Sequence, residues 1–564
     1  MLKFSKTASV LLLLLAISTP VFAQKKSSAP EIVIAQNGAD KLLEDLKSVV
    51  LSNPANQKEW NSLKEYLEVF LIKVDRTRPI RLDLILGDGP MRYRPSIPVN
   101  KIDLMKFRKQ NLEPLGIKTR RVAGALYKCK GAFTGYMRYR NGYVTFAEKR
   151  GGVPFDAKPP LVGIARLVAA YDLALRGRNT ATAGNDLMDR RTWFQKNRNE
   201  LEAALKKKKT ESEAQFNFRK LLLTQQLNEA ERIYAEASEL LLGWNTDIAK
   251  GEGRLDLKLS AISGTSLDQS IKLFNNNPTH FANIPRSSSA ILSARVNHPL
   301  DDMRQTHFLE IFKSIQDQLV EKVNGNEKLT AEEKAARVTA ADLVVKLLSE
   351  NVKKGLFDGF VEVHQNKSGK NTAIGGLKTV DGTQLVKVLE TLAKVDQAKS
   401  IQLDIAKEGD VRIHSAKIDA KKYPSFSFFL GDDTLYIGSS KDVIWLASGE
   451  NAIEELKTSI KQVAKPNAGK ASDPFVKLFV KIGPWLKLHQ QRRGNEGDVE
   501  LRKNALKAFE PGIDALTLEL KREKDTIVGQ MIVQNDILRF AGNMIAQFTK
   551  EQLSEDAEGT KPKK

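Results

Sequence analysis

Apolar and polar residues follow two different periods along the chain, and the changes of period predict helices and strands in groups. A period of two residues is typical of half-buried strands, whereas a period near 3.6 is typical of amphipathic helices. Residues 133–150 alternate on both sides of Asn141-Gly142, the strongest short signal for a tight hairpin. From about Pro160 an apolar stripe continues to Leu175, so we expect a helix that ends at Gly177.

Residues 426–442 predict a second hairpin followed by a helix. The stretches 426–430 and 434–437 alternate, and Gly431-Asp432-Asp433 between them has the composition of a hairpin turn. Ser439 and Asp442 have the spacing of a helix capping box before the apolar run 443–447. We therefore interpret the two adjacent aspartates as turn residues, since calcium requires a spaced set of oxygen ligands that is missing here.

The order of predicted elements repeats, which indicates two related modules, at 36–276 and 290–549. Each module closes with a strand and then a helix. A long charged helical hairpin is expected in the first module, interrupted near the four lysines 206–209, and a shorter counterpart is expected in the second. Because strands and helices are grouped rather than alternating strictly, the predicted fold class is α+β, with antiparallel sheets and packed helices. Residues 277–289, rich in Asn, Pro and Ser, are expected to be a linker.

The first residues have the three parts of a secretory signal peptide. Lys3 and Lys6 precede an apolar run at 10–17, and small residues lead to Ala23. Cleavage is expected after Ala23, so residues 1–23 would be removed, 24–35 would form an N-terminal linker, and the mature protein would be periplasmic or secreted. The apolar run is too short to span a bilayer, and no later segment is long and apolar enough. Residues 550–564 are charged and predict a disordered tail.

The charge is uneven. The chain has a formal net charge of +21, and residues 24–280 hold 44 basic and 29 acidic side chains, against 43 and 39 in residues 281–564. The excess is greatest in residues 76–150, with 18 basic and 5 acidic side chains. A basic first module favours an anionic partner and does not bear on the fold.

Motifs for catalysis, metal binding and nucleotide binding are missing. The six histidines do not pair at helical spacing, and the best metal-like cluster, His298 with Asp301 and Asp302, is better explained by aspartates at a helix N-terminus. Cys129, the only cysteine, excludes an intrachain disulfide and has no histidine partner, so a buried thiol is favoured over a nucleophile. We expect no cofactor and no metal, and no specific nucleic-acid motif occurs.

A basic stretch that includes tyrosines is the candidate binding feature. In the predicted strand at 136–140, alternate residues place Tyr136 and two arginines on one face. Such a face binds an anionic polymer through charge and stacking, and the alternative is an ordinary solvated sheet surface. The candidate anion-binding residues are Arg92, Arg94, Lys128, Lys130, Tyr136, Arg138 and Arg140.

The stretches "SAILSARVNHPLDDMRQ", "GDDTLYIGSS" and "LTLELKREKDTIVGQMIV" resemble large exported proteins of unknown function from planctomycete-type bacteria. This resemblance covers residues 284–549 and implies only the fold and export. We expect an exported, non-enzymatic binding or structural protein, engaging an anionic envelope polymer or a lipid head group. The alternative is a hydrolase acting on an envelope polymer, with its site between the modules.

Overall fold

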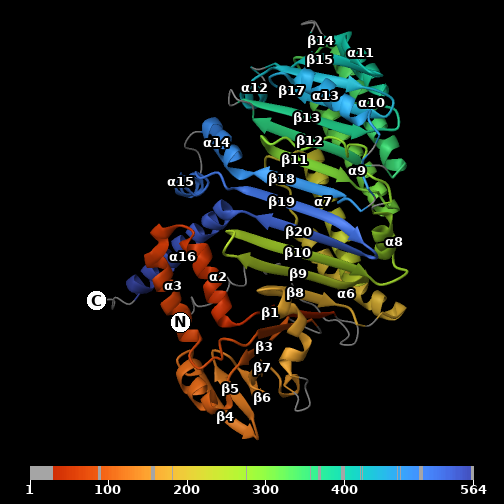
Figure 1. Ribbon diagram of the computed structural model, residues 1–564. Helices are drawn as coiled ribbons and strands as arrows, with labels where there is room; N and C mark the ends of the chain where they lie inside the picture. Colours follow the sequence, from red (N-terminus) through yellow and green to blue (C-terminus); the bar gives the residue numbers. More distant parts are fainter. Residues whose placement is uncertain are drawn as a thin grey trace.

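The strands of the chain join into one antiparallel sheet, shown in the computed structural model of Figure 1. The structure describes residues 30–559 except for 87–90, 154–158, 181, 275, 356, 366–369, 396–399, 420, 422–423, 467, 471 and 494–498. Within these residues the first half contributes β1 (Glu31–Gln36), β2 (Ile80–Ile85), β3 (Arg92–Pro98), β4 (Ile117–Ala123), β5 (Leu126–Gly131), β6 (Gly135–Arg140), β7 (Tyr143–Ala147), β8 (Leu173–Arg178), β9 (Ala237–Asp247) and β10 (Glu252–Ala261). The second half contributes β11 (Ala290–Asn297), β12 (Asp358–Gln365), β13 (Asn371–Lys378), β14 (Ile401–Glu408), β15 (Val411–Lys417), β16 (Thr434–Ser439), β17 (Val443–Ser448), β18 (Val476–Lys481), β19 (Ala515–Glu523) and β20 (Thr526–Val533).

The two halves place their strands in the same order. Outward from the centre, the first half runs β10-β9-β8-β1-β2-β3-β7-β6-β5-β4. The second half runs β20-β19-β18-β11-β12-β13-β17-β16-β15-β14. At each place in the second order stands the strand whose number is ten higher than that of the strand at the same place in the first. The predicted α+β fold with two related antiparallel modules is therefore confirmed.

The helices also occupy matching places in the two halves. The first half has α2 (Ala39–Leu51), α3 (Gln57–Phe70), α4 (Leu104–Phe107), α5 (Ala165–Ala170), α6 (Gly184–Ala204), α7 (Glu213–Glu236) and α8 (Ser266–Leu273). The second has α9 (Asp302–Asn324), α10 (Ala331–Lys353), α11 (Gln384–Ala393), α12 (Pro424–Leu430), α13 (Ala452–Val463), α14 (Ile482–Arg493), α15 (Val499–Ala508) and α16 (Asn535–Gly559). A helix pair follows β1 and β11, another follows β8 and β18, and a single helix follows β10 and β20. The predicted helical hairpin of the first half is α6 and α7.

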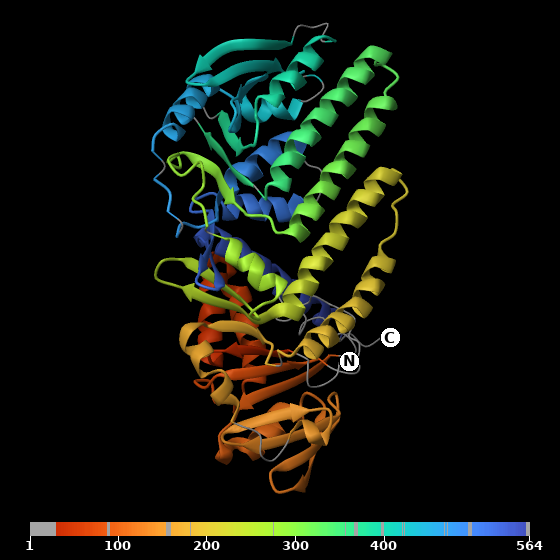
Figure 2. The ribbon, with the colours of Figure 1, turned by 90° about the vertical axis from the view of Figure 1, so that its right-hand side faces the viewer.

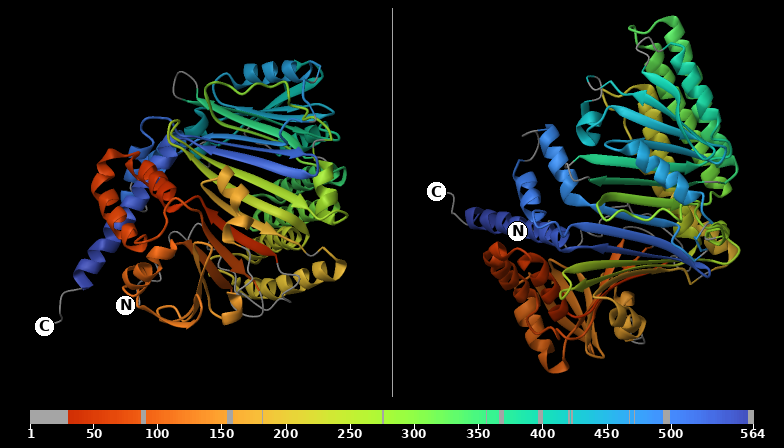
Figure 3. Two further views of the ribbon diagram at one scale, coloured as in Figure 1. Left: turned by 60° about the horizontal axis from the view of Figure 1, so that its bottom comes forward. Right: turned by 45° about the horizontal axis from the view of Figure 1, so that its top comes forward.

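Sheet pairing and helix packing hold the halves together. β10 pairs with β20 from Gly253↔Val533 to Ser260↔Thr526, so the sheet is continuous and twists through the molecule (Figure 3). α7 packs against α9 of the other half, and Figure 2 shows α6, α7, α9 and α10, in yellow and green, along one side. On the other side α16 packs against α2, and Arg539 donates a hydrogen bond to the carbonyl of Ser52 at 3.0 Å.

The segment expected to be a linker, 277–289, is part of the second half. Phe281 and Ile284 are buried in a core with Phe360, Ile413 and Trp445. The rings of Phe281 and Phe360 lie 4.9 Å apart. The backbone of this segment is irregular, as its Asn, Pro and Ser content indicates. However, the buried side chains of Phe281 and Ile284 fix its position against the second half.

Two of the predicted elements are wrong in type. Residues 426–430 belong to helix α12, and the run 443–447 belongs to strand β17 instead of a helix. The β-branched and aromatic side chains of "VIWLA" favour a strand, and Ser440 makes the hairpin turn between β16 and β17 by bonding to Val443. Asp432 accepts from the backbone N–H of Thr434 at 3.0 Å, which is a local turn role, as interpreted.

The helix expected from Pro160 to Gly177 is also different. A short 3₁₀ turn at Pro160–Gly163 and helix α5 are followed directly by strand β8 from Leu173. The apolar stripe has helical spacing, but its second part, with Leu175, pairs with β1 and β9 in the sheet. Tertiary pairing decides the conformation here.

Several local signals are confirmed. Asn141 and Gly142 have φ of 50° and 76°, which the tight turn between β6 and β7 requires. Asp301 accepts from the N–H of Arg304 as the N-cap of α9. α14 begins at Ile482, directly after β18, and Gly483 and Pro484 lie in its first turn. α16 extends to Gly559 and thus includes residues 550–559 of the expected tail, whereas residues 560–564 and residues 1–23, where the signal peptide is expected, lie outside the described residues. No helix in the described part of the chain has both the length and the apolar character needed to cross a membrane.

Candidate functional site

One face of the first half carries all the predicted anion-binding residues. Lys128 lies opposite Tyr136, Arg138 opposite Thr145, Thr145 opposite Ser96, and Arg94 opposite Asp83. Because side chains alternate along a strand, this register puts all seven predicted residues on the same face of β3, β5 and β6. We call it the basic face, and the opposite face of these strands packs against α4 through Phe107.

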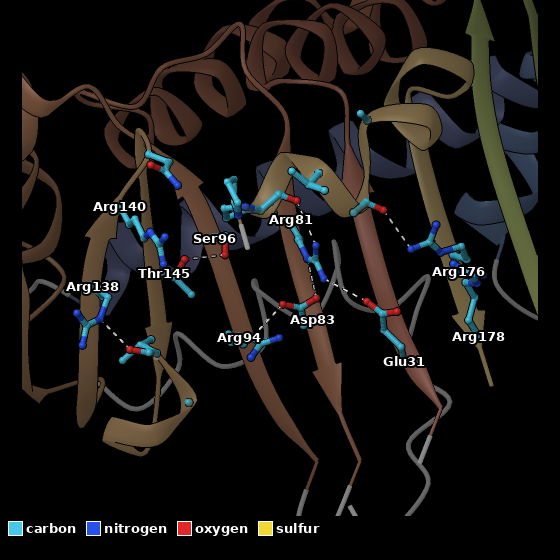
Figure 4. A pocket seen from close by; sticks show the side chains of 18 of the residues that line it. Glu31, Arg81, Asp83, Arg94, Ser96, Arg138, Arg140, Thr145, Arg176 and Arg178 are labelled. Carbon is cyan, nitrogen blue, oxygen red and sulfur yellow. Dashed lines mark hydrogen bonds and ion pairs between the residues drawn. The ribbon is translucent and has the colours of Figure 1, made fainter. Parts of the chain in front are cut away.

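A cavity of about 700 Å³ lies on the basic face (Figure 4). Its floor is formed by strands β6, β7, β3, β2, β1 and β8. Among the described residues, seven arginines and two carboxylates line it: Arg81, Arg94, Arg138, Arg140, Arg166, Arg176, Arg178, Glu31 and Asp83. Three of the seven predicted residues are in this lining, whereas Arg92, Lys128, Lys130 and Tyr136 lie on the same face outside it.

The sequence analysis missed four of the seven arginines. Arg176 and Arg178 were assigned to a helix and its end, but they lie on β8, beside β1 in the sheet. Arg81 lies on β2, and Arg166 on α5. The alternation of Ala174, Arg176 and Arg178 is a strand signal, which the longer helical stripe before it obscured.

The two carboxylates are held by arginines of the cavity. Asp83 accepts from Arg81 at 2.7 Å and from Arg94 at 2.9 Å, through different oxygens. Glu31 lies 3.4 Å from Arg81. These ion pairs neutralise the centre of the floor, and further guanidiniums lie on both sides of it, toward β6 and toward β8 (Figure 4).

The described residues 152–153 and 159–166, between β7 and β8, form a wall of the cavity, and arginines bind it through its carbonyl groups. Arg138 donates to Val153 at 2.8 Å, Arg81 to Pro160 at 3.1 Å, and Arg176 to Gly163 at 3.1 Å. Each guanidinium has five donors, and one of them in each of these arginines fixes the wall to the floor.

The remaining donors differ in their environment. Burial lowers the pKa of Arg176, and its Nε is buried with no hydrogen-bond partner among the described residues. Arg166 and Arg178 are exposed, and among the described residues their side chains have no ion pair or hydrogen bond. The cavity therefore has both a desolvated cation and accessible ones.

Tyr136 does not have the stacking position that the sequence suggested. It packs against Leu126, Ala147 and Val153 and is not in the cavity lining. The lining contains no aromatic residue among the described residues, and its neutral polar groups are Ser96, Thr145 and Asn141. Ser96 and Thr145 share a hydrogen bond of 2.9 Å.

The matching face of the second half holds a hydrophobic core in place of a cavity. Arg138, Thr145, Ser96 and Arg81 lie in one row across β6, β7, β3 and β2. The matching row across β16, β17, β13 and β12 is Gly438, Trp445, Gly376 and Phe360. By the same register, Arg94 corresponds to Ile374 and Arg176 to Phe479.

The covering helices explain the difference. α13 packs against β13 and β17 and buries Ala452, Leu456 and Ile460 over Trp445. α5 is shorter and packs against β1 and β8 instead, where Ile164 and Leu167 are buried. Within the described part of the chain, no helix therefore lies over the face of β2, β3, β7 and β6, and arginines take the places that apolar side chains occupy in the other half.

The second half contains a serine, a histidine and an aspartate in hydrogen-bonding order. Ser439 Oγ is 3.3 Å from Nε2 of His414, and Asp404 Oδ1 is 3.7 Å from its Nδ1. However, the backbone N–H of Asp404 donates to Nδ1 at 3.0 Å, so the proton of the neutral ring is on Nε2 and points to the serine. A general base needs a free Nε2, and both His414 and Ser439 are buried, so this arrangement is structural.

The carboxylates that meet between the halves are also paired. Asp301 and Glu229 both accept from Arg232 at 2.7 Å and from Arg304. These guanidiniums and backbone contacts together hold the pKa of Asp301 near 2, despite its burial. Burial lowers the pKa of His298 to about 4 and raises that of the Cys129 thiol to about 11. Among the described residues, no group of His, Cys, Asp or Glu is placed to hold a metal ion.

Comparison of the chain with protein-family models, with curated proteins and with solved structures finds no match.

Proposed function

We propose that this chain is an exported, non-enzymatic binding protein that holds an anionic ligand in the arginine-lined cavity of its first half. The single observation that carries the proposal is the contrast between the halves. The same sheet face is filled by Phe360, Ile374 and Trp445 in one half and lined by arginines in the other.

The contrast is an argument for function because charged side chains on a concave sheet face reduce stability. Apolar burial there contributes about 1.5–3 kcal/mol for each large side chain, and the second half has that contribution. A buried donor without a partner, such as Nε of Arg176, costs about 1–3 kcal/mol. A fold that can place a core at this position but keeps guanidiniums there is expected to use them, since departures from good packing occur mostly at functional sites.

The equal order of strands supports an internal duplication as the origin of the contrast. Tyr136 lies opposite Ala147, and Tyr436 lies opposite Ala447 at the matching place in the second half. In this proposal one copy kept an apolar core and the other acquired the binding cavity. Export, to the periplasm or outside the cell, is supported by the signal-peptide pattern of residues 1–23.

Binding of dextran sulfate by the full-length mature chain tests the proposal. Arg166→Gln with Arg178→Gln removes two exposed guanidiniums, while Lys477→Gln with Lys481→Gln removes the same charge from the second half, and Lys481 matches Arg178 by register. If each guanidinium contributes about 1.5 kcal/mol, the arginine variant binds about a hundredfold more weakly. Its log–log salt dependence also becomes shallower by roughly 1–2. The lysine variant is expected to bind like the wild type. Equal loss in both variants would mean that dextran sulfate senses only the overall charge, and the proposal would be wrong.

A further inference from the structure

We propose that the ligand is an acidic polysaccharide that lies across the strands, with its acidic groups on the arginine floor and its sugar rings against the wall. This inference rests on the proposed function and adds the class of the ligand and its direction. Three observations carry it: the choice of arginine, the length of the charged floor, and the mixed lining of the cavity.

The cations of the lining are all arginines. The chain has 59 lysines and 30 arginines, yet none of the seven cations that line the cavity among the described residues is a lysine. A guanidinium has a planar fork that bonds two oxygens of one group, whereas an ammonium acts as a point charge. The lining therefore fits carboxylate or sulfate groups, and a preference for positive charge alone would have left lysines among the seven.

The charged floor is longer than a single acidic group. Arg138 and Arg140 lie on β6, and Arg176 and Arg178 lie on β8, five strand positions away. At about 4.8 Å for each position this distance is roughly 24 Å. Between them the ion pairs of Asp83 reduce the positive charge (Figure 4). One ligand reaches both groups only if it carries acidic groups repeatedly along its length and runs perpendicular to the strands.

The wall supplies apolar surface that a purely ionic polymer would not use. Val153, Pro159, Pro160, Val162 and Ala165 line it, and the side chain of Val162 is 65% exposed. Ser96, Thr145 and Asn141 add neutral polar groups. Sugar rings have both C–H faces and hydroxyl groups, so they match this lining. Nucleobases would gain little, because the described lining has no aromatic side chain on which to stack.

Oligogalacturonates of increasing length, measured by calorimetry on the full-length mature chain, test the direction of the ligand. Affinity is expected to rise with length until the oligomer reaches from β6 to β8, and then to level off. Arg178→Gln should lower the affinity for long oligomers about tenfold and leave short ones less affected, with Lys481→Gln as the matched control. An affinity that stops rising at the dimer, or an equal loss for all lengths, would overturn the extended binding mode while leaving anion binding intact.

Polyphosphate of matched charge, single-stranded DNA and vesicles of an anionic phospholipid test the class of the ligand. Val162→Ser should weaken oligogalacturonate binding and leave polyphosphate binding unchanged, because only the sugar contacts the wall. A sulfated oligosaccharide of the same length should also bind and show the same dependence on Val162. Tighter binding of polyphosphate, DNA or vesicles, or no effect of Val162→Ser, would overturn the polysaccharide assignment. Failure of every anion to bind would overturn the proposed function itself.

Discussion

The ionic cluster between the halves provides a quantitative prediction. Arg304 on α9 donates to Glu229 at 2.7 and 3.2 Å, to Ser270 at 2.7 Å and to Asp301 at 3.3 Å. It thus connects the second half to α7 and α8 of the first. Arg304→Gln removes these contacts and keeps a side chain of similar length.

The magnitude follows from burial and from the partners that remain. Arg304 and Asp301 have side chains only 19% and 15% exposed, so their attraction is screened little by solvent. Breaking a buried pair costs about 3–5 kcal/mol when it leaves a charge alone. Here Arg232 continues to pair with both Asp301 and Glu229, so we expect the lower end, about 3 kcal/mol.

Urea unfolding followed by tryptophan fluorescence measures this cost, because both halves contain tryptophans. Lys313→Gln is the control, since the Lys313–Asp317 pair of 2.6 Å is 67% and 55% exposed and should contribute less than about 0.5 kcal/mol. The wild type is expected to unfold in one transition that Arg304→Gln moves to lower urea. The reasoning is refuted if Arg304→Gln and Lys313→Gln have the same midpoint, or if the wild type loses its halves in separate transitions.

Three further predictions concern the core, the pH dependence and the thiol. Gly438→Ala should lower the unfolding free energy by about 1–3 kcal/mol, because a Cβ there would lie 3.0 Å from that of Trp445; an unchanged urea midpoint would contradict this. His298 has a folded pKa near 4, below its unfolded value of 6.5, so its stabilisation is complete above pH 6.5 and is lost toward pH 4. At pH 5 the wild type should have lost about 2 kcal/mol more than His298→Phe, and parallel pH profiles would contradict the assignment. Cys129 should resist iodoacetamide at pH 8 in the folded protein and react after unfolding, as mass spectrometry would show.

The sequence predicts elements well where local chemistry and tertiary packing agree. The Asn141-Gly142 turn and the helical hairpin before β9 both form as expected. It fails where one pattern is compatible with two structures. The run "SFSFFL" alternates like a strand but forms α12, and "VIWLA" follows a cap-like spacing but forms β17. The Ser439–Asp442 spacing fits a capping box, but the neighbouring Ser440 makes a hairpin turn with Val443, and only the pairing of β17 with β13 and β16 decides between the two structures.

The candidate site was partly predictable for a related reason. Arg138 and Arg140 are close in sequence to the hairpin, so their shared face follows from alternation alone. Arg81, Arg176 and Arg178 join them only because β2 and β8 are brought beside β3 and β1 by pairings between residues far apart in the chain. The cavity itself depends on the absence of a helix over the face, and that depends on where α5 packs. No local pattern in the sequence contains this information.

The shared sheet explains why the two halves can differ so much on one face. An isolated half would expose the edge of β10 or β20, and long unpaired edges invite association with other chains. In the joined sheet these two strands pair with each other, and the edges that remain within the described residues, β4 and β14, both have irregular register. β4 also carries exposed Lys118, Arg120 and Arg121, which oppose edge pairing. The second half therefore contributes a core around Trp445 and a partner for β10, and this support lets the first half keep arginines where a core would otherwise form. By this argument the cavity requires the complete sheet, and binding should be lost when β20 is removed even though none of its residues contacts the cavity.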